Sequence, residues 1–237
     1  MAHQSKPVAV VTGASQGLGL ALAKALSDEG WWLIVDARDG RRLQAAVARL
    51  PEDRIVVTVP GDVADAAHRE AIARAATALG PVSLVINNAS TLGASPLPRL
   101  DRIDPATFAR IFAVNVIAPV ALVQALVDDL APGATIINVT SDAGVEAYEG
   151  WGGYGASKAA LEHASHVLAA ERPDLRVLIV DPGDMRTQMH QDAFPGEDIS
   201  DRPEPSAAVP GFLELIHGTQ PSGRYQARSL ANASMSV

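Results

Sequence analysis

The chain has no cysteine, and positive charge is in the minority. Without cysteine it can form no disulfide, no thiolate nucleophile and no cysteine metal site. Its 27 acidic residues outnumber its 19 lysines and arginines, giving a net charge of −8. That balance disfavours nucleic acid or an anionic membrane as the main partner. The six histidines show no ligand spacing, so we expect no metal site.

Long uninterrupted hydrophobic runs are also missing. The longest apolar region, 111–127, is broken by Asn115, Pro119 and Gln124, and we interpret it as a buried helix rather than a membrane span. The first residues, 1–7, lack the apolar core of a signal peptide. Together these absences favour a cytoplasmic protein that has no membrane partner.

What the chain does have is a regular alternation of apolar and amphipathic segments. At 237 residues and 48% hydrophobic content it suits one α/β domain, 1–237, and no linker divides it. Short apolar runs alternate with amphipathic helical patterns. This alternation predicts a doubly wound, Rossmann-type parallel sheet with helices on both faces. The predicted strands are 7–12, 32–36, 55–59, 83–87, 134–139 and 176–181, and the predicted helices are 18–29, 39–50, 64–79, 104–129 and 154–171.

A glycine-rich turn, Thr12–Gly19, follows the first apolar run and opens an Ala/Leu-rich helix. Glycine tolerates the backbone angles of such a turn and lets a pyrophosphate approach the main chain. Free N–H groups at the helix start then point at the anion. This order predicts a dinucleotide site at Gly13, Ser15, Gln16, Gly17, Leu18 and Gly19.

A second signature lies far downstream, at Tyr154 and Lys158, with Ser141 thirteen positions before the tyrosine. Residues four apart project from one helix face. A phenol titrates near ~10, and a neighbouring ammonium is expected to lower the pKa of Tyr154 toward the working range. Ser141 would bond the same substrate oxygen, although a strand-end capping role would also suit it.

In their order along the chain, these motifs resemble the short-chain dehydrogenase/reductase family over nearly the whole length. The matching positions are 12–19, Asp62–Val63, Asn87–Ala89, Asn115, Ser141, Tyr154, Lys158, Pro182–Gly183 and Thr187. One position departs from the family pattern. Ser90 stands where the family sequence Asn-Asn-Ala-Gly has its glycine, and a serine there restricts the backbone conformations of the loop. The stretch Gly150-Trp151-x-x-Tyr154 also resembles the sepiapterin and benzil reductase branch.

The resemblance implies a role for each matching residue. Tyr154 would be the proton donor in reduction, Lys158 would bind the nicotinamide ribose, Ser141 would orient the carbonyl, and Asn115 would hold a water. Cofactor contacts are implied for Asp62 and Val63 at the adenine, Asn88 and Ala89 after the fourth strand, Pro182–Gly183 beneath the nicotinamide, and Thr187. Two structural alternatives stay open: Asp62 as the N-cap of the helix 64–78, and Asn115 as a buried helix kink.

The end of the second predicted strand bears on the choice of cofactor. An acidic side chain there would select NAD(H), whereas an arginine would pair with the 2′-phosphate of NADP(H). The family's acid position, about eighteen residues after Gly19, is Ala37, and Arg38 follows it. We therefore expect NADP(H). NAD(H) remains possible if the strand end shifts by one residue and Asp36 meets the ribose.

The segment 184–210 is irregular and rich in proline, and the resemblance implies a substrate loop and lid, with helix predicted at 206–217. Trp151, Met185 and Met189 suggest a pocket for an apolar or aromatic carbonyl. We expect a reductase of a small ketone or aldehyde. An NAD-dependent alcohol dehydrogenase and a non-catalytic dinucleotide-binding regulator are the alternatives. The family pairs the helices 104–129 and 154–171 between subunits, which implies a homodimer or homotetramer.

Overall fold

The computed structural model describes residues 6–51 and 54–234, and a parallel sheet of seven strands runs through them. The strand order is β3-β2-β1-β4-β5-β6-β7, so the chain reverses its direction of winding between β1 and β4. This is the doubly wound, Rossmann-type arrangement that the sequence predicts. The strands are β1 (Val8–Val11), β2 (Trp32–Ala37), β3 (Val56–Pro60), β4 (Val82–Asn87), β5 (Leu130–Val139), β6 (Arg176–Asp181) and β7 (Gly223–Gln226).

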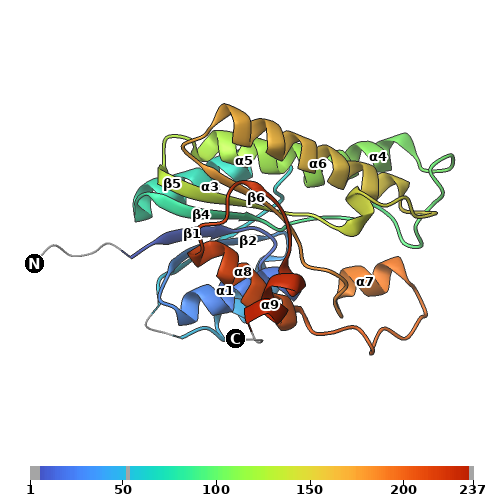
Figure 1. Cartoon of the computed structure of the whole chain (residues 1–237), viewed down its shortest axis with the longest axis horizontal. Helices are drawn as coiled ribbons and strands as arrows, with labels where there is room; N and C mark the ends of the chain where they lie inside the picture. Colours follow the sequence, from blue (N-terminus) through green and yellow to red (C-terminus); the bar gives the residue numbers. More distant parts are fainter. Residues whose placement is uncertain (1–5, 52–53, 235–237) are drawn as a thin grey trace, which may run out of the picture.

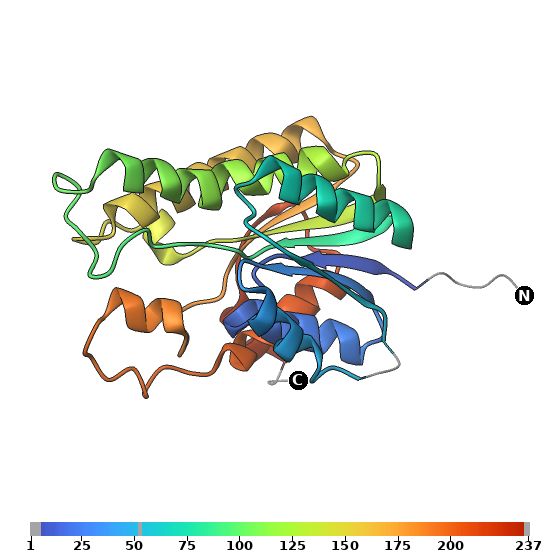
Figure 2. The same cartoon turned by 180° about the vertical axis from the view of Figure 1, so that it is seen from behind.

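Helices cover both faces of the sheet (Figures 1 and 2). On one face α1 (Gly17–Asp28), α2 (Gly40–Val47) and α8 (Val209–His217) bury Leu22, Leu43 and Phe212, and α9 (Ala227–Ser234) closes that layer. On the other face α3 (Ala66–Leu79), α5 (Ala118–Leu126) and α6 (Gly152–Glu171) pack on the sheet, with α4 (Pro105–Phe112) at one end. The strands lie between two apolar layers, which explains their nearly unbroken apolar sequences.

The single helix predicted at 104–129 forms as three consecutive parts. α4 is followed by a π-helical turn, Ala113–Ile117, and then by α5, which ends at Leu126. Asp104 caps the start of α4 by accepting a hydrogen bond from the backbone N–H of Thr107. A π turn widens the helix by one residue and changes the direction in which its side chains point.

Three elements escaped the sequence analysis. The irregular segment 184–210 contains a short helix, α7 (Gln188–Ala193), before the 3-10 turn Pro205–Ala208 that leads into α8. The polar sequence after Tyr225, for which the sequence analysis predicts no element, completes β7 and continues as α9. β7 is four residues long and reads Gly-Arg-Tyr-Gln, so neither length nor apolar content marks it as a strand.

One helix among the described residues has the length and composition of a membrane span. It runs from Pro105 to Leu126, and its mean hydropathy is 1.9. The core helix of a soluble protein meets the same criteria, and Leu122 and Leu126 pack here against the sheet. Other apolar residues of the helix are exposed, including Ile117 and Val120.

The close packing of α8 on the start of α9 provides a test of the unpredicted C-terminal layer. A Cβ on Gly211 would lie 1.9 Å from the carbonyl oxygen of Ala227, which is a backbone atom and cannot swing away. We expect Gly211→Ala to lower the free energy of unfolding by about 1–3 kcal/mol, as overpacking does. Gly223→Ala is the matched control, because its nearest neighbour would lie at 3.7 Å. Equal denaturation midpoints for the two variants would contradict the packing described.

Candidate functional site

The turn between β1 and α1 depends on three glycines for two different reasons. Gly13 and Gly17 have φ values of +68° and +57°, which only glycine adopts without strain. Gly19 is needed for close approach, because a Cβ there would lie 2.5 Å from both the Gly13 carbonyl oxygen and the Asn88 amide nitrogen. One side of the turn, with Gly13 and Gly17, lines the cavity, and the other side packs tightly against Asn88.

Asn88 and Thr12 hold this turn against the end of β4. The Asn88 side chain donates to the carbonyl oxygens of Thr12 (2.9 Å) and Gly13 (3.3 Å). The Thr12 hydroxyl accepts from the backbone N–H groups of Asn88 and Ala89, both at 3.0 Å. Both predicted cofactor residues after β4 thus also shape the glycine turn.

The N-terminus of α1 differs from those of the neighbouring helices. Asp39, Asp65 and Asp104 cap α2, α3 and α4, whereas no side chain among the described residues caps α1. Its first N–H groups remain available to an anion, and the helix dipole favours negative charge there. A glycine turn that a Cβ would fill and an uncapped helix start together fit the pyrophosphate of a dinucleotide.

The end of β2 shows where Asp36 points. Asp36 is 2% exposed. Its carboxylate accepts a hydrogen bond from the Gly13 N–H at 2.7 Å and pairs with His68 Nε2 at 2.9 Å. Burial raises the pKa of Asp36, and these two partners oppose the rise. Because β2 continues through Ala37 and Asp36 faces inward, the alternative in which Asp36 meets a ribose is wrong.

Cationic side chains occupy the outer side of the same strand end. Arg38 is exposed and lines the cavity. Arg42, one helical turn further on, donates to the Gln16 side chain at 2.5 Å, and Gln16 belongs to the glycine turn. The sequence analysis missed Arg42, although its spacing of four from Arg38 at the start of a helix was a signal for it.

Asp62 does not cap the following helix, so that alternative is also wrong. α3 begins at Ala66, and Asp65 is its N-cap. Asp62 instead accepts from the Ala64 N–H (2.9 Å) and forms an ion pair with Arg110 of α4. Burial would raise the pKa of Asp62, but these two partners prevail and lower it. Val63 is buried and packs near Ala89.

Tyr154, Lys158 and Ser141 meet at the carboxyl ends of β5 and β6. Tyr154 and Lys158 are buried on α6, with the Lys158 ammonium 5.4 Å from the centroid of the Tyr154 ring. Ser141 follows β5, and its hydroxyl donates to the Asp142 carboxylate at 2.8 Å and accepts from the Ala143 N–H at 3.2 Å, so it also has the capping role. The adjacent Thr140 hydroxyl donates to the buried Glu162, and both residues line the cavity.

The expected lowering of the Tyr154 pKa by Lys158 is not found. Burial raises the pKa of this phenol, and the carboxylates of Asp181 and Asp142 add to the rise, whereas the hydroxyls of Ser90 and Ser141 oppose it. Burial also lowers the pKa of Lys158 to about 8. The ammonium donates to the Val139 carbonyl oxygen at 2.8 Å, so part of its charge is directed at the backbone.

Asn115 lies in the π turn, fully engaged by protein groups. Its amide donates to the Thr91 carbonyl oxygen (2.9 Å) and to the Ser157 hydroxyl (3.0 Å). Its carbonyl oxygen accepts from the Ser90 hydroxyl (3.1 Å) and from the Thr91 N–H (2.9 Å). Asn115 is therefore more than a packing kink: it joins the loop after β4 to α6.

Pro182–Gly183 turns the chain from β6 toward α7. Gly183 has a φ of +72°, and its N–H donates to the Asp181 carboxylate at 2.9 Å. The Thr187 hydroxyl caps α7 by accepting from the His190 N–H. A Cβ on Gly17 would lie 3.6 Å from the Thr187 methyl group, so Thr187 stands over the glycine turn.

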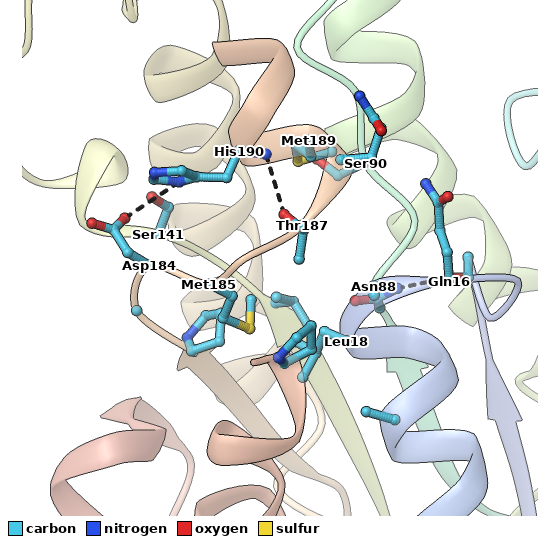
Figure 3. Close-up of a pocket in the computed structure, with 18 of the residues that line it drawn as sticks. Gln16, Leu18, Asn88, Ser90, Ser141, Asp184, Met185, Thr187, Met189 and His190 are labelled. Atoms are coloured by element: carbon cyan, nitrogen blue, oxygen red, sulfur yellow. Dashed lines mark hydrogen bonds and ion pairs between the residues drawn. The ribbon is translucent and has the colours of Figure 1, made fainter. Parts of the chain in front are cut away.

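A cavity of about 660 Å³ connects these parts. Figure 3 shows its two walls, with Gln16, Leu18 and Asn88 on one and the segment from Asp184 to His190 on the other. Among the predicted site residues, Gly19, Asp62, Val63 and Asn115 do not line the cavity. Those that do are Gly13, Ser15, Gln16, Gly17, Leu18, Arg38, Asn88, Ala89, Ser141, Trp151, Tyr154, Lys158, Pro182, Gly183, Met185, Thr187 and Met189.

Aromatic rings gather beside Tyr154. Trp151 meets the Tyr154 ring edge-on at a centroid distance of 5.7 Å and lies 5.9 Å from Phe194, which follows α7. His190 in turn lies 4.9 Å from Phe194. The sequence analysis missed His190 and Phe194. No group of three or more histidine, aspartate or glutamate side chains suited to a metal occurs in the described part of the chain.

Comparison with known proteins agrees with this geometry. The family model described as short chain dehydrogenase matches residues 7–198. The chain is 34% identical to sepiapterin reductase of Meriones unguiculatus over 199 residues, covering 78% of this chain and 76% of the relative. It is 32% identical to the benzil reductase ((S)-benzoin forming) of Saccharomyces cerevisiae over 197 residues, covering 78% and 74%.

Solved structures show the same fold. A short chain dehydrogenase from Escherichia coli CFT073, complexed with NADPH, superposes with a TM-score of 0.86 at 29% identity, covering 94% of this chain and 96% of the other. The resemblance to the sepiapterin and benzil reductase branch is thus confirmed. The chain belongs to the short-chain dehydrogenase family and is an NAD(P)-dependent oxidoreductase.

Proposed function

We propose that the protein is an NADP(H)-dependent reductase of small apolar or aromatic ketones and aldehydes, with Tyr154 as the general acid. One observation carries the proposal: a single cavity is lined by the glycine turn at one end and by Tyr154, Lys158 and Ser141 at the other. The glycine turn would hold the pyrophosphate of a dinucleotide, which would supply the hydride, and Tyr154, at the other end of the same cavity, would supply the proton.

The chain's residues hold the carbonyl and supply the proton. When bound, NADPH supplies the hydride that reduces the carbonyl carbon. Ser141 orients the carbonyl oxygen, and the Tyr154 phenol gives that oxygen its proton as negative charge develops there. Lys158, whose pKa burial lowers to about 8, keeps most of its charge near neutral pH, and its ammonium would bind the nicotinamide ribose.

The walls of the cavity support an aromatic or apolar substrate. Trp151 and the Tyr154 ring line the cavity beside the phenol, with Phe194 packed against Trp151, while Met185 and Met189 add pliable apolar side chains. Aromatic rings favour edge-on or offset contacts with other rings. We infer that the segment 184–210 acts as the lid over this surface. The names of the relatives, sepiapterin reductase and benzil reductase, agree with a substrate that carries rings.

Preference for NADP(H) over NAD(H) rests on the end of β2. Ala37 takes the place of an acid that would bind ribose hydroxyls, and the carboxylate of Asp36 is already committed to Gly13 and His68. Arg38 lines the cavity with its charge exposed. An arginine there suits a 2′-phosphate, because a charge-assisted contact is about twice as strong as a neutral hydrogen bond.

We further propose that the chain assembles through α4, α5 and α6. These helices lie side by side on the outer face (Figures 1 and 2), where the apolar side chains of Ile117, Val120 and Val167 are 58%, 40% and 41% exposed. A second copy related by two-fold symmetry would bury this face against itself. The proposed assembly is a homodimer or homotetramer.

Removing the Tyr154 hydroxyl tests the chemistry. We expect Tyr154→Phe to lower kcat for benzil reduction by at least a hundredfold, the range typical of a lost general acid, while NADPH still binds. Steady-state kinetics and NADPH fluorescence titration measure the two effects. Tyr225→Phe is the matched control, since that hydroxyl bonds the Pro221 carbonyl oxygen outside the cavity. Near-normal reduction by Tyr154→Phe would overturn the proposed mechanism.

Removing the Arg38 guanidinium tests the cofactor preference. We expect Arg38→Ala to weaken NADPH binding by roughly ten- to a hundredfold and NADH binding far less, because only NADPH carries the 2′-phosphate. Arg41→Ala is the matched control, as Arg41 is exposed at the start of α2, three residues after Arg38, and does not line the cavity. Asp36→Ala should weaken both cofactors, because its carboxylate holds the glycine turn. Equal losses for both cofactors in Arg38→Ala would refute the assignment.

Light scattering tests the assembly. At micromolar concentration we expect a mass two or four times the 24.7 kDa of one chain. Placing a charge in the exposed apolar face, as in Ile117→Glu, should shift the mass toward one chain, because burying an unpaired charge is costly. Lys24→Gln, on the opposite face of the sheet, makes the same one-unit change of net charge and serves as the control. A wild-type mass of one chain that persists on concentration would rule out the interface.

A further inference from the structure

The carboxylate of Asp36 joins β2 to two other parts of the fold. Its Oδ1 accepts the Gly13 N–H at 2.7 Å, and its Oδ2 lies 2.9 Å from Nε2 of His68, which belongs to α3. Asp36 and His68 are 2% and 7% exposed, so water has little access to either side chain. A charge so deeply buried is costly unless it is paired and hydrogen-bonded, and here each oxygen has its own partner.

The ring of His68 fills a space that the chain leaves open for it. Gly61, directly after β3, lies against the ring: a Cβ there would stand 2.3 Å from Nδ1 and 2.7 Å from Cγ of His68. Gly61 is not among the glycines with positive φ, so its backbone conformation would suit other residues too. The absence of a side chain at Gly61 therefore serves the imidazole ring rather than the backbone.

His68 suits an ionised Asp36, because its Nε2 can donate in both protonation states of the ring. A carboxylate has acceptors and no donor, so the nitrogen that faces Oδ2 must carry a hydrogen. Nε2 carries one in the charged imidazolium and in one of the two neutral tautomers. Imidazole is the stronger base of the two groups, so the shared proton stays on nitrogen. Asp36 can then remain charged, and a charged acceptor binds the Gly13 N–H about twice as strongly as a neutral one.

The bond to Asp36 fixes the first glycine of the turn. Gly13 has a φ of +68° and lines the cavity, and its carbonyl oxygen accepts from the Asn88 side chain. With its N–H held by Asp36, both backbone polar groups of Gly13 have partners. The residues after Gly13 lead into the uncapped start of α1. A shift at Gly13 would therefore move the N–H groups that would receive a pyrophosphate.

We propose that His68 is a positioning residue for the dinucleotide: by donating to Asp36 it keeps this carboxylate charged and bonded to Gly13, and so holds the glycine turn in the shape that receives the pyrophosphate. His68 does not line the cavity and acts through Asp36. The inference rests on the proposed function only in placing the pyrophosphate on the glycine turn, and it is independent of the substrate.

Burial and charge act on Asp36 in opposite directions. Burial raises the pKa of Asp36 and the nearby Asp62 carboxylate adds to the rise, whereas the bonds from His68 and Gly13 oppose it. Without His68 the pKa of Asp36 should therefore rise further. The carboxyl group would then take up a proton at a higher pH than in the wild type.

Other charged groups near Asp36 remain when His68 is removed. Asp62, from the loop after β3, is paired with Arg110 of α4 and also feels the charge of Arg38. Arg69 of α3 donates to a backbone carbonyl oxygen of the loop after β3. The glycine turn, 12–19, contains no charged residue. The loss of His68 thus removes the hydrogen-bond donor of Asp36 on α3 and leaves these charges as they are.

The test measures how tightly NADH binds between about pH 6 and about pH 9, by fluorescence titration. NADH is used because it has no 2′-phosphate, whose own titration would obscure the result. Below its pKa Asp36 is protonated and bonds Gly13 weakly, and above its pKa Asp36 is charged and bonds Gly13 strongly. In His68→Leu we expect NADH binding to be about tenfold weaker than in the wild type near the acid end of this range, and to recover as the pH rises.

Four further variants control the comparison. His68→Gln keeps an N–H donor and should restore the wild-type profile. Gly61→Ala crowds the ring without removing it, so it should shift the profile in the same direction as His68→Leu. In Asp36→Asn the titrating group is gone, and adding His68→Leu to it should produce no pH dependence. His163→Leu, exposed on α6 and outside the cavity, is the matched control.

The outcomes separate this inference from the proposed function. A pH profile of His68→Leu that coincides with that of the wild type overturns the inference and leaves the proposed function standing. A loss of NADH binding in His68→Leu that is equal at every pH marks a merely structural role and also overturns it. If His68→Leu does not fold, Gly61→Ala carries the same comparison. A wild type that binds neither NADH nor NADPH overturns the inference and the proposed function together.

Discussion

The contact between the glycine turn and the end of β4 is the constraint on which the rest of the site depends. It lies between β1 and β4, where the order of the sheet reverses and a crevice opens at the carboxyl ends of the strands. Gly19 allows the approach, Asn88 closes it with two hydrogen bonds, and Asp36 holds the Gly13 N–H from the other side. A side chain at Gly19 would separate the two strand ends and with them the two halves of the cavity.

Hydrogen bonds between buried polar groups keep the reacting side chains in place. Beneath the site, Asn87 donates to Asn138, which donates to Ser165 of α6, so β4, β5 and α6 are joined through side chains. Behind Ser141, Arg224 of β7 reaches both Glu162 and Asp181. An unpaired polar group at these positions would cost about 1–3 kcal/mol, so the networks favour one arrangement of the site.

Burial works in opposite directions on the two central side chains of α6. It raises the pKa of the Tyr154 phenol and lowers the pKa of the Lys158 ammonium, because in each case the charged form loses hydration. The phenol therefore starts the reaction as a firmly protonated acid. The hydrogen-bond donors and positive charges near Tyr154 then determine how readily the phenolate forms. The hydroxyls of Ser90 and Ser141 matter for this reason, because they oppose the rise in the pKa of Tyr154.

The sequence by itself determined the fold class, the glycine turn and the positions of Tyr154, Lys158 and Ser141, because all of these follow from local patterns. Apolar runs and helical periodicity mark β1 to β6, and fixed spacings mark the three side chains. The sequence analysis could not predict β7, since its polar residues become a strand only by pairing with β6. The engagement of Asp36 by His68 and the hydrogen bonds that join Asn115 to Thr91 and Ser157 were decided by tertiary structure alone. Each joins residues that are distant along the chain, and no local pattern records which of them meet.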